Sequence, residues 1–207
     1  MPELHRPAHA VRMVTASSLF DGHDASINIM RRILQSQGVE VIHLGHNRSV
    51  AEVVAAVLEE DVQGVAISSY QGGHVEYFRY LVDRLRTEGR GDVRVYGGGG
   101  GVFVPDEIAD LEAYGVTKIF SPDDGQRLGL APMINTIVAA CDVDPVAAGT
   151  PTVDDVLAGH HRSVARVITA LEVGRLPDDD WRDLQEAAGV LLELRAIPLG
   201  VAVAEEE

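Results

Sequence analysis

VRMVTASSLFDGHDASINIM (residues 11–30) is the stretch that decides the fold. Residues 11–17 form an apolar, β-branched run typical of a strand, and residues 24–37 have the apolar spacing of an amphipathic helix. Between them lie Asp21 and His23, an ionisable pair placed directly after a strand. A strand, a loop and a helix in this order form the repeating unit of α/β proteins with parallel sheets.

The same alternation of strands and helices continues to about residue 142. The further predicted strands are 39–45, 62–69, 92–98 and 115–120, and the helices after them are 49–60, 74–88, 105–114 and 124–140. Strands that are apolar on both faces indicate a parallel sheet covered on both sides. Five such units favour a doubly wound, flavodoxin-like (Rossmann-type) sheet, in which ligands bind at the carboxyl ends of the strands.

The pattern changes after Asp142. Residues 144–152 have the composition of a linker, 153–173 and 179–195 have helical patterns, and 196–207 form a short strand or a tail. We therefore expect an α/β domain over residues 10–142 and a linker with a helical extension over residues 143–207.

Composition narrows the classes of function. The 207 residues are 46% hydrophobic, enough for a sizeable core, and the net charge of −15 argues against nucleic-acid binding. The single cysteine, Cys141, allows neither an internal disulfide nor a cysteine metal site, which fits a reducing cytoplasm. We find no signal peptide and no apolar run near the ~20 residues that span a membrane.

The Asp21–His23 pair has the chemistry of a metal ligand and its partner. Imidazole binds metals through one ring nitrogen, and a carboxylate on the other nitrogen fixes the tautomer. One histidine without cysteines cannot hold a bare ion, so the metal would have to bring its own ligands, as it does in a macrocycle. Alternatively, Asp21 caps the next helix and His23 is an ordinary loop residue.

Glycines dominate the loop after the fourth strand, VYGGGGGVFVP (residues 95–105). No lysine follows them, so they do not form a phosphate loop, and the dinucleotide-binding pattern is met only in degenerate form. Glycine also lets a flat or bulky ligand approach the backbone closely. The alternative is a flexible bulge.

Three loops taken together resemble a known family. Asp-x-His after the first strand, Ser-x-Tyr after the third and Gly-Gly after the fourth are similar to the cobalamin-binding domains of acyl-CoA mutases and of methionine synthase. The resemblance implies that His23 is the lower axial ligand of cobalt and that Asp21 orients it. It also implies that the nucleotide tail of cobalamin, displaced from cobalt by the histidine, enters the sheet beside Ser68, Gly97 and Gly98.

On this resemblance, the cofactor-binding residues are Asp21, Gly22, His23, Ser26, Ser68, Tyr70, Gly73, His74, Gly97, Gly98, Gly99 and Ser121. Two of these assignments have open alternatives, because His74 is also suited to a helix start and Ser121 to a helix cap. The sequence departs from the family pattern at three positions. Ser26 stands where the motif has glycine, Ser17 where mutases often have lysine, and Tyr70 where leucine is usual.

The segments 21–49, 66–78, 97–108 and 120–130 are further similar to fused isobutyryl-CoA mutases, adenosylcobalamin enzymes that interconvert isobutyryl-CoA and n-butyryl-CoA. The resemblance implies adenosylcobalamin as cofactor, an acyl-CoA-binding barrel subunit or domain as partner, and a G-protein chaperone. The sequence contains neither the phosphate loop of a GTPase nor room for the barrel. We therefore expect a cofactor-carrying part of an isomerase with no catalytic residues of its own.

Other classes remain as alternatives. A corrinoid carrier for methyl transfer often has a helical cap before the sheet, and only about ten residues precede the first strand here. A cobalamin sensor that controls genes would need a basic DNA-binding region, which this acidic chain lacks. A module similar to a response regulator would need neither His23 nor the glycines.

Overall fold

The computed structural model describes residues 4–147 and 149–196. The chain divides into two compact units, Met1–Ala148 and Gly149–Glu207. The predicted short strand or tail lies, from residue 197 onward, outside the described residues. The expected boundary between residues 142 and 143 stays a prediction.

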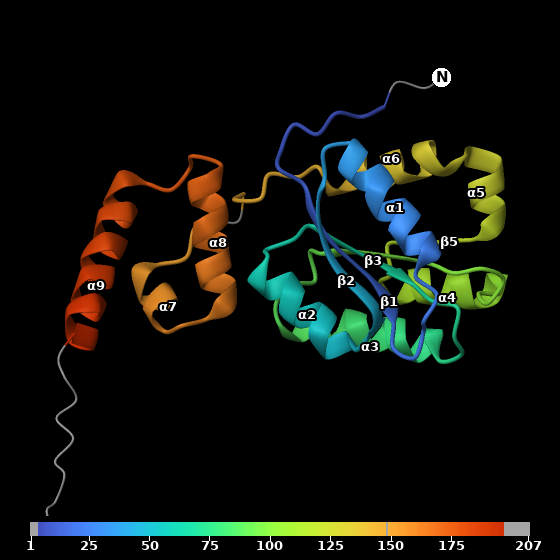
Figure 1. Ribbon diagram of the computed structural model, residues 1–207, viewed down its shortest axis with the longest axis horizontal. Coiled ribbons are helices and arrows are strands. Elements are labelled where there is room, and N and C mark those ends of the chain that lie inside the picture. The colour runs from blue at the N-terminus through green and yellow to red at the C-terminus, as the bar shows by residue number, and fades with distance from the viewer. Residues whose placement is uncertain (1–3, 148, 197–207) are drawn as a thin grey trace, which may run out of the picture. The chain divides into compact units, whose positions relative to one another are not determined.

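The first unit is built on a five-stranded parallel sheet with the order β2-β1-β3-β4-β5 (Figure 1). The strands are β1 (Arg12–Ser18), β2 (Glu40–Arg48), β3 (Gly64–Ser68), β4 (Arg94–Gly98) and β5 (Lys118–Phe120). This order is that of a flavodoxin-like fold, so the predicted fold class is confirmed. The order reverses between β1 and β3, where ligand crevices form in such sheets.

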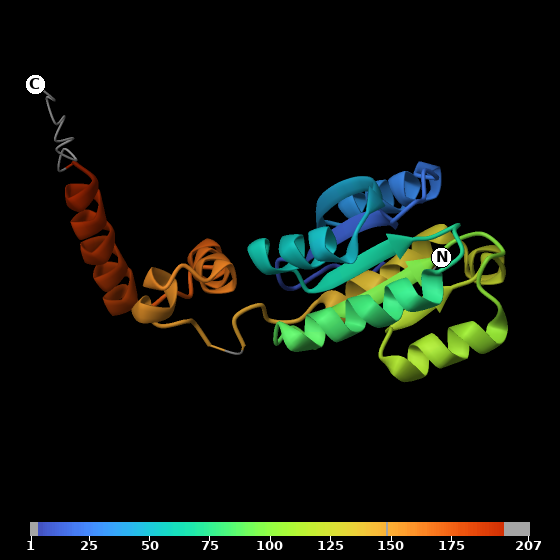
Figure 2. The same cartoon turned by 90° about the horizontal axis from the view of Figure 1, so that it is seen from below.

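Helices cover both faces of the sheet (Figures 1 and 2). One face carries α1 (Ala25–Ser36) and α6 (Leu130–Cys141), with α5 (Pro122–Leu128) beside α6; the other carries α2 (Val50–Glu59), α3 (His74–Thr87) and α4 (Pro105–Tyr114). The buried apolar side chains accordingly form two clusters. β1 and β3 are buried along nearly their whole length, as strands packed on both faces must be.

Two elements differ from their predicted bounds because of left-handed backbone. β2 continues past residue 45 to Arg48, through register shifts against β1 and left-handed conformations at Gly45 (φ +84°) and Asn47 (φ +58°). The helix predicted over 124–140 is two helices, because Gly129 (φ +79°, ψ 154°) is not helical. Pro132, in the first turn of α6, also lacks the N–H that a continuous helix would need.

The second unit contains α7 (Val153–Leu157), α8 (His161–Glu172) and α9 (Asp178–Ala196). The single helix predicted over 153–173 is broken at Gly159, which has φ +76°. Thr152 starts α7 through a capping box with Asp155. Within the described residues no helix is long and apolar enough to cross a membrane.

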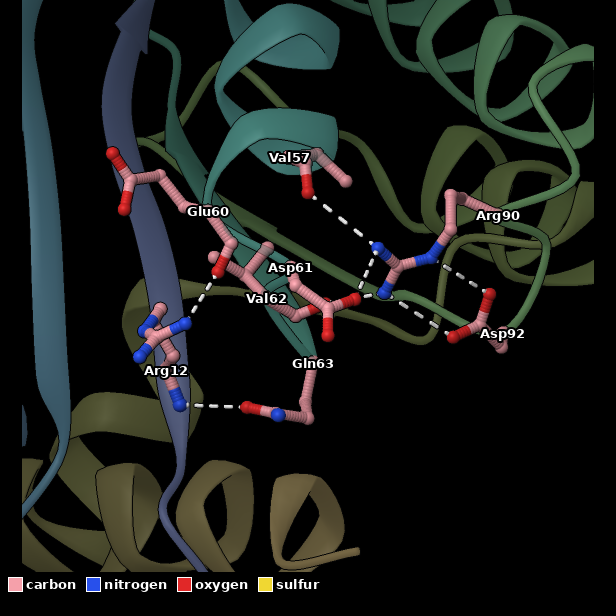
Figure 3. A network of polar contacts seen from close by, with 8 residues as sticks. All are labelled: Arg12, Val57, Glu60, Asp61, Val62, Gln63, Arg90 and Asp92. Atoms are coloured by element: carbon pink, nitrogen blue, oxygen red, sulfur yellow. Dashed lines mark hydrogen bonds and ion pairs between the residues drawn. The ribbon is translucent and has the colours of Figure 1, made fainter. Parts of the chain in front are cut away.

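A buried arginine connects the turns at the amino ends of the strands (Figure 3). The Arg90 side chain is only 2% exposed, and its guanidinium bonds Asp61 at 3.1 Å and Asp92 at 3.1 Å. It also donates to the carbonyl oxygens of Val62 at 2.7 Å and of Val57 at 3.5 Å. These contacts join the turn before β3 to the turn before β4, at the sheet edge opposite the strand-end loops.

We expect Arg90→Ala to lower the free energy of unfolding by about 3–5 kcal/mol, because it removes the buried ion pair between Arg90 and Asp61. Urea denaturation measures the loss. Arg84→Ala on α3 is the control, since its ion pair with Glu88 is exposed and contributes about 1 kcal/mol or less. Equal losses in the two variants would contradict the prediction.

Candidate functional site

The site begins with the Asp21 carboxylate, which is completely buried at the end of β1. Its Oδ1 accepts hydrogen bonds from the backbone N–H of His23 at 2.8 Å and from the His23 Nδ1 at 2.9 Å. Its Oδ2 accepts from the backbone N–H of Tyr70 at 2.6 Å. One side chain therefore joins the loop after β1 to the loop after β3.

The His23 imidazole is held at one nitrogen and open at the other. Nδ1 lies on Asp21, while the side chain is 68% exposed and Nε2 has no hydrogen-bond partner among the described residues. Ser17, where mutases often have lysine, donates to the His23 carbonyl oxygen at 3.1 Å rather than to the Asp21 carboxylate. The arrangement is that of a metal ligand with an orienting carboxylate.

The carboxyl end of β2 supports the Asp21 turn through Asn47. The Asn47 side chain accepts a hydrogen bond from the Phe20 N–H at 2.8 Å, and the Asn47 N–H donates to the Asp21 carbonyl oxygen at 3.1 Å. Phe20 and Asn47 both have left-handed backbone, φ 66° and 58°. Asparagine tolerates this conformation better than most other non-glycine residues. The sequence places Asn47 at the ligand end of the second strand but does not indicate its contacts with the Asp21 turn.

Beside this loop a cavity of about 390 Å³ lies between the sheet and the helices α1, α5 and α6. Of the predicted residues, Ser26, Ser68, Tyr70, Gly97, Gly98, Gly99 and Ser121 line it. The rest of the wall is largely apolar and includes Ile27, Met30 and Leu34 of α1 and Met133, Ile134 and Ile137 of α6. These helix residues read as ordinary core positions in the sequence, so sequence reasoning missed them.

The polar side chains of the cavity differ in their hydrogen-bond partners. The hydroxyls of Ser26 and Ser68 lie 3.2 Å apart, within hydrogen-bond distance. Ser121 caps α5 through Asp124, and the backbone N–H of Ser121 is the main reason that the pKa of Asp124 lies below its usual value. Tyr96 is buried, which raises the pKa of its phenol, and its hydroxyl has no hydrogen-bond partner among the described residues.

The glycines after β4 are required by close packing within the protein. A Cβ on Gly99 would lie 1.6 Å from the carbonyl oxygen of Ser69, and one on Gly97 would lie 2.5 Å from the Phe78 ring. A Cβ on Gly100 would lie 2.6 Å from the Tyr70 ring. Because these positions carry no side chain, the β4 loop lies directly against the β3 loop and leaves the cavity open beside it.

Five predicted residues do not line the cavity: Asp21, Gly22, His23, Gly73 and His74. His74 lies 2.9 Å from Glu107 through Nε2 and 3.2 Å from the Gln71 carbonyl oxygen through Nδ1, so it links α3 to α4. The His74 hydrogen bond lowers the pKa of the Glu107 carboxyl. Cofactor contacts by Gly22, Gly73 and His74 stay predictions.

The site fits a macrocyclic metal cofactor better than a free ion. In the part of the chain that the structure describes, no cluster of three histidine, cysteine or carboxylate side chains could hold a metal ion. A single open imidazole nitrogen suits a metal whose other ligands come from a macrocycle. The cavity beside it offers an apolar space for an aromatic group of the same ligand.

Comparison with known proteins agrees with this geometry. The family model described as B12 binding domain matches residues 11–126. The chain belongs to the B12-binding domain family. Its function as a cobalamin-binding domain, predicted from the strand-end residues, is confirmed.

Relatives of this B12-binding chain include mutases. It is 66% identical over 169 residues to a fused isobutyryl-CoA mutase from Cupriavidus metallidurans, a match that covers 82% of the chain but 16% of that protein's length. It is 30% identical over 131 residues to the 2-hydroxyisobutanoyl-CoA mutase small subunit of Aquincola tertiaricarbonis, covering 63% of the chain and 93% of the subunit.

Solved structures include proteins of the same fold. A cobalamin-binding protein from Desulfitobacterium hafniense matches with a TM-score of 0.52 and 26% sequence identity, over 63% of this chain and 59% of that one. The match supports both the doubly wound sheet and cobalamin as the ligand of this B12-binding chain.

We expect Gly99→Ala to lower the free energy of unfolding by about 1–3 kcal/mol and to weaken cobalamin binding, because the new methyl group would overlap the Ser69 carbonyl. Gly101→Ala is the matched control, since nothing lies within 4 Å of the added Cβ. Denaturation and a cobalamin titration of both variants check this. A Gly99→Ala protein that matches Gly101→Ala in both would refute the packing role.

Proposed function

We propose that this chain holds adenosylcobalamin with His23 as the lower axial ligand of cobalt and with the nucleotide tail in the cavity between the sheet and the helices α1, α5 and α6. The displaced base then no longer binds cobalt, which is the base-off form of the cofactor. The observation that carries the proposal is the His23 imidazole, fixed through Nδ1 on a buried carboxylate and open at Nε2.

Asp21 tunes the ligand in this proposal. A hydrogen bond from Nδ1 to the carboxylate fixes the tautomer that leaves the Nε2 lone pair free, and it raises the basicity of that nitrogen. Because the Asp21 side chain is completely buried, water does not compete for its carboxylate oxygens. The tautomer and the position of Nδ1 are thus set before the cofactor arrives.

In this proposal, the other predicted residues that line the cavity contact the nucleotide tail. A dimethylbenzimidazole is flat and apolar, and it fits a space walled by α1 and α6 side chains on one side and by the β3 and β4 strands on the other. Ser68 and Ser121 place hydroxyls on the wall, and Gly98 and Gly99 let the β4 backbone on this wall pack closely against the neighbouring backbone of Phe120 and Ser69. These residues hold the tail in place.

Adenosylcobalamin supplies a cobalt–carbon bond whose homolysis starts radical rearrangements, and the protein supplies binding and orientation. The reaction we propose is the carbon-skeleton rearrangement of a short acyl-CoA, on an acyl-CoA-binding barrel in another subunit or domain. Relatives named as a fused isobutyryl-CoA mutase and as a mutase small subunit support this partner. A G-protein chaperone and a cytoplasmic location belong to the same proposal.

We expect wild type to convert adenosylcobalamin to a base-off, histidine-ligated spectrum and His23→Ala to lose that spectrum, because the variant lacks the open imidazole nitrogen. The measurement is a visible-spectrum titration of the purified chain. His46→Ala is the matched control, since His46 is an exposed histidine in β2 of the same sheet. If His23→Ala keeps the histidine-ligated spectrum, His23 is not the axial ligand.

We expect Ala66→Leu to weaken cobalamin binding by about tenfold to a hundredfold, since the added atoms fill the space assigned to the tail. Cobinamide, a corrinoid without the nucleotide tail, is the control ligand, and its affinity should not change. Equal losses for both corrinoids would mean that the cavity does not receive the tail.

A further inference from the structure

Tyr70 lies between the His23 imidazole and the tail cavity. Its ring centroid is 5.3 Å from that of His23 with a tilt of 37°, which is within the range of attractive aromatic pairs. The ring also packs against Gly100, where a Cβ would lie only 2.6 Å from Tyr70 Cε1. The same ring forms part of the cavity wall. Tyr70 therefore contacts both parts of the proposed site.

The backbone of Tyr70 is tied to the same carboxylate as the imidazole. Asp21 Oδ2 accepts from the Tyr70 N–H at 2.6 Å, and Oδ1 accepts from His23 Nδ1 at 2.9 Å. The hydrogen bond at Nδ1 holds the imidazole through one atom and does not by itself set the tilt of the ring. The Tyr70 ring is the neighbouring group that can restrict this tilt, since its centroid lies 5.3 Å from that of the imidazole with 37° between the two planes.

We propose that Tyr70 is a positioning residue that couples the occupied tail cavity to the orientation of the His23 imidazole. A group bound in the cavity presses on the Tyr70 ring, and the ring, held on its far side by the Gly100 loop, fixes the tilt of the imidazole and so the direction of Nε2. A leucine at this position would fill space without offering a flat face to the imidazole. The proposal rests on the proposed function, because it takes His23 as the ligand and the cavity as the tail site.

The test compares wild type with Tyr70→Leu, Tyr70→Phe and His23→Ala. Each protein is labelled with ¹⁵N-histidine and loaded with cob(II)alamin and, separately, with reduced cobinamide. Electron paramagnetic resonance records the two-line splitting from an axial ¹⁵N imidazole, which the unlabelled nitrogen of the cofactor's own base does not give. Corrinoid affinities come from visible-spectrum titrations, and urea denaturation shows that each variant is folded. Tyr70→Phe keeps the ring, so it should behave as wild type.

With cob(II)alamin, we expect Tyr70→Leu to broaden or lose the nitrogen splitting and to bind about threefold to tenfold more weakly than wild type. With cobinamide, wild type and Tyr70→Leu should give the same spectrum, because no tail loads the ring. Unchanged splitting in Tyr70→Leu with cob(II)alamin would overturn the proposal. So would an equal effect with both corrinoids, or a Tyr70→Phe variant that fails like Tyr70→Leu.

The His23→Ala variant distinguishes a wrong ligand assignment from a wrong role for Tyr70. If His23→Ala keeps the wild-type splitting, the ligand assignment is wrong and the proposed function fails with it. If His23→Ala loses the splitting while Tyr70→Leu keeps it, the proposed function stands and only the role of Tyr70 is refuted.

Discussion

The site depends on one buried carboxylate. Asp21 is removed from water at the end of β1, and an ionised group in that position is stable only if hydrogen bonds replace its hydration. It receives them from His23 and from the Tyr70 backbone, which lie in two different loops. The need to satisfy this charge therefore brings the β1 and β3 loops together and fixes the imidazole between them. Asn47, at the end of β2, holds the same β1 loop through the backbone of Phe20 and of Asp21.

The turns before the strands and the loops after them differ in their contacts. At the amino edge, the strand-preceding turns are held by the Arg90 guanidinium, whose contacts lie within the protein (Figure 3). At the carboxyl edge, the His23 imidazole and the cavity present groups that the protein itself does not satisfy. The Arg90 contacts stabilise the amino ends of the strands, so the carboxyl ends can keep groups without protein partners. Ligand sites at the carboxyl ends are typical of parallel α/β folds.

The order of elements and the residues Asp21, His23, Ser68 and Gly97–Gly99 could be predicted from the sequence, because hydrophobic periodicity and strand-end residue types are local signals. The breaks at Gly129 and Gly159 could not, since an isolated glycine inside a helical pattern is usually tolerated. The cavity could not either. Met30 and Met133 have the spacing of ordinary core residues, and only the tertiary arrangement shows a space between their helices.

The cavity between α1, α6 and the sheet also has a thermodynamic consequence. Its walls are apolar side chains that gain no packing partner until something fills the space, so the unliganded chain lacks contacts that a close-packed interior would have. A ligand that binds only the folded state adds stability by mass action, about 2.7 kcal/mol when its free concentration is 100 times Kd. Cofactor supply thereby sets the resistance of the chain to unfolding and proteolysis, and the lifetime of the protein reports on its loading.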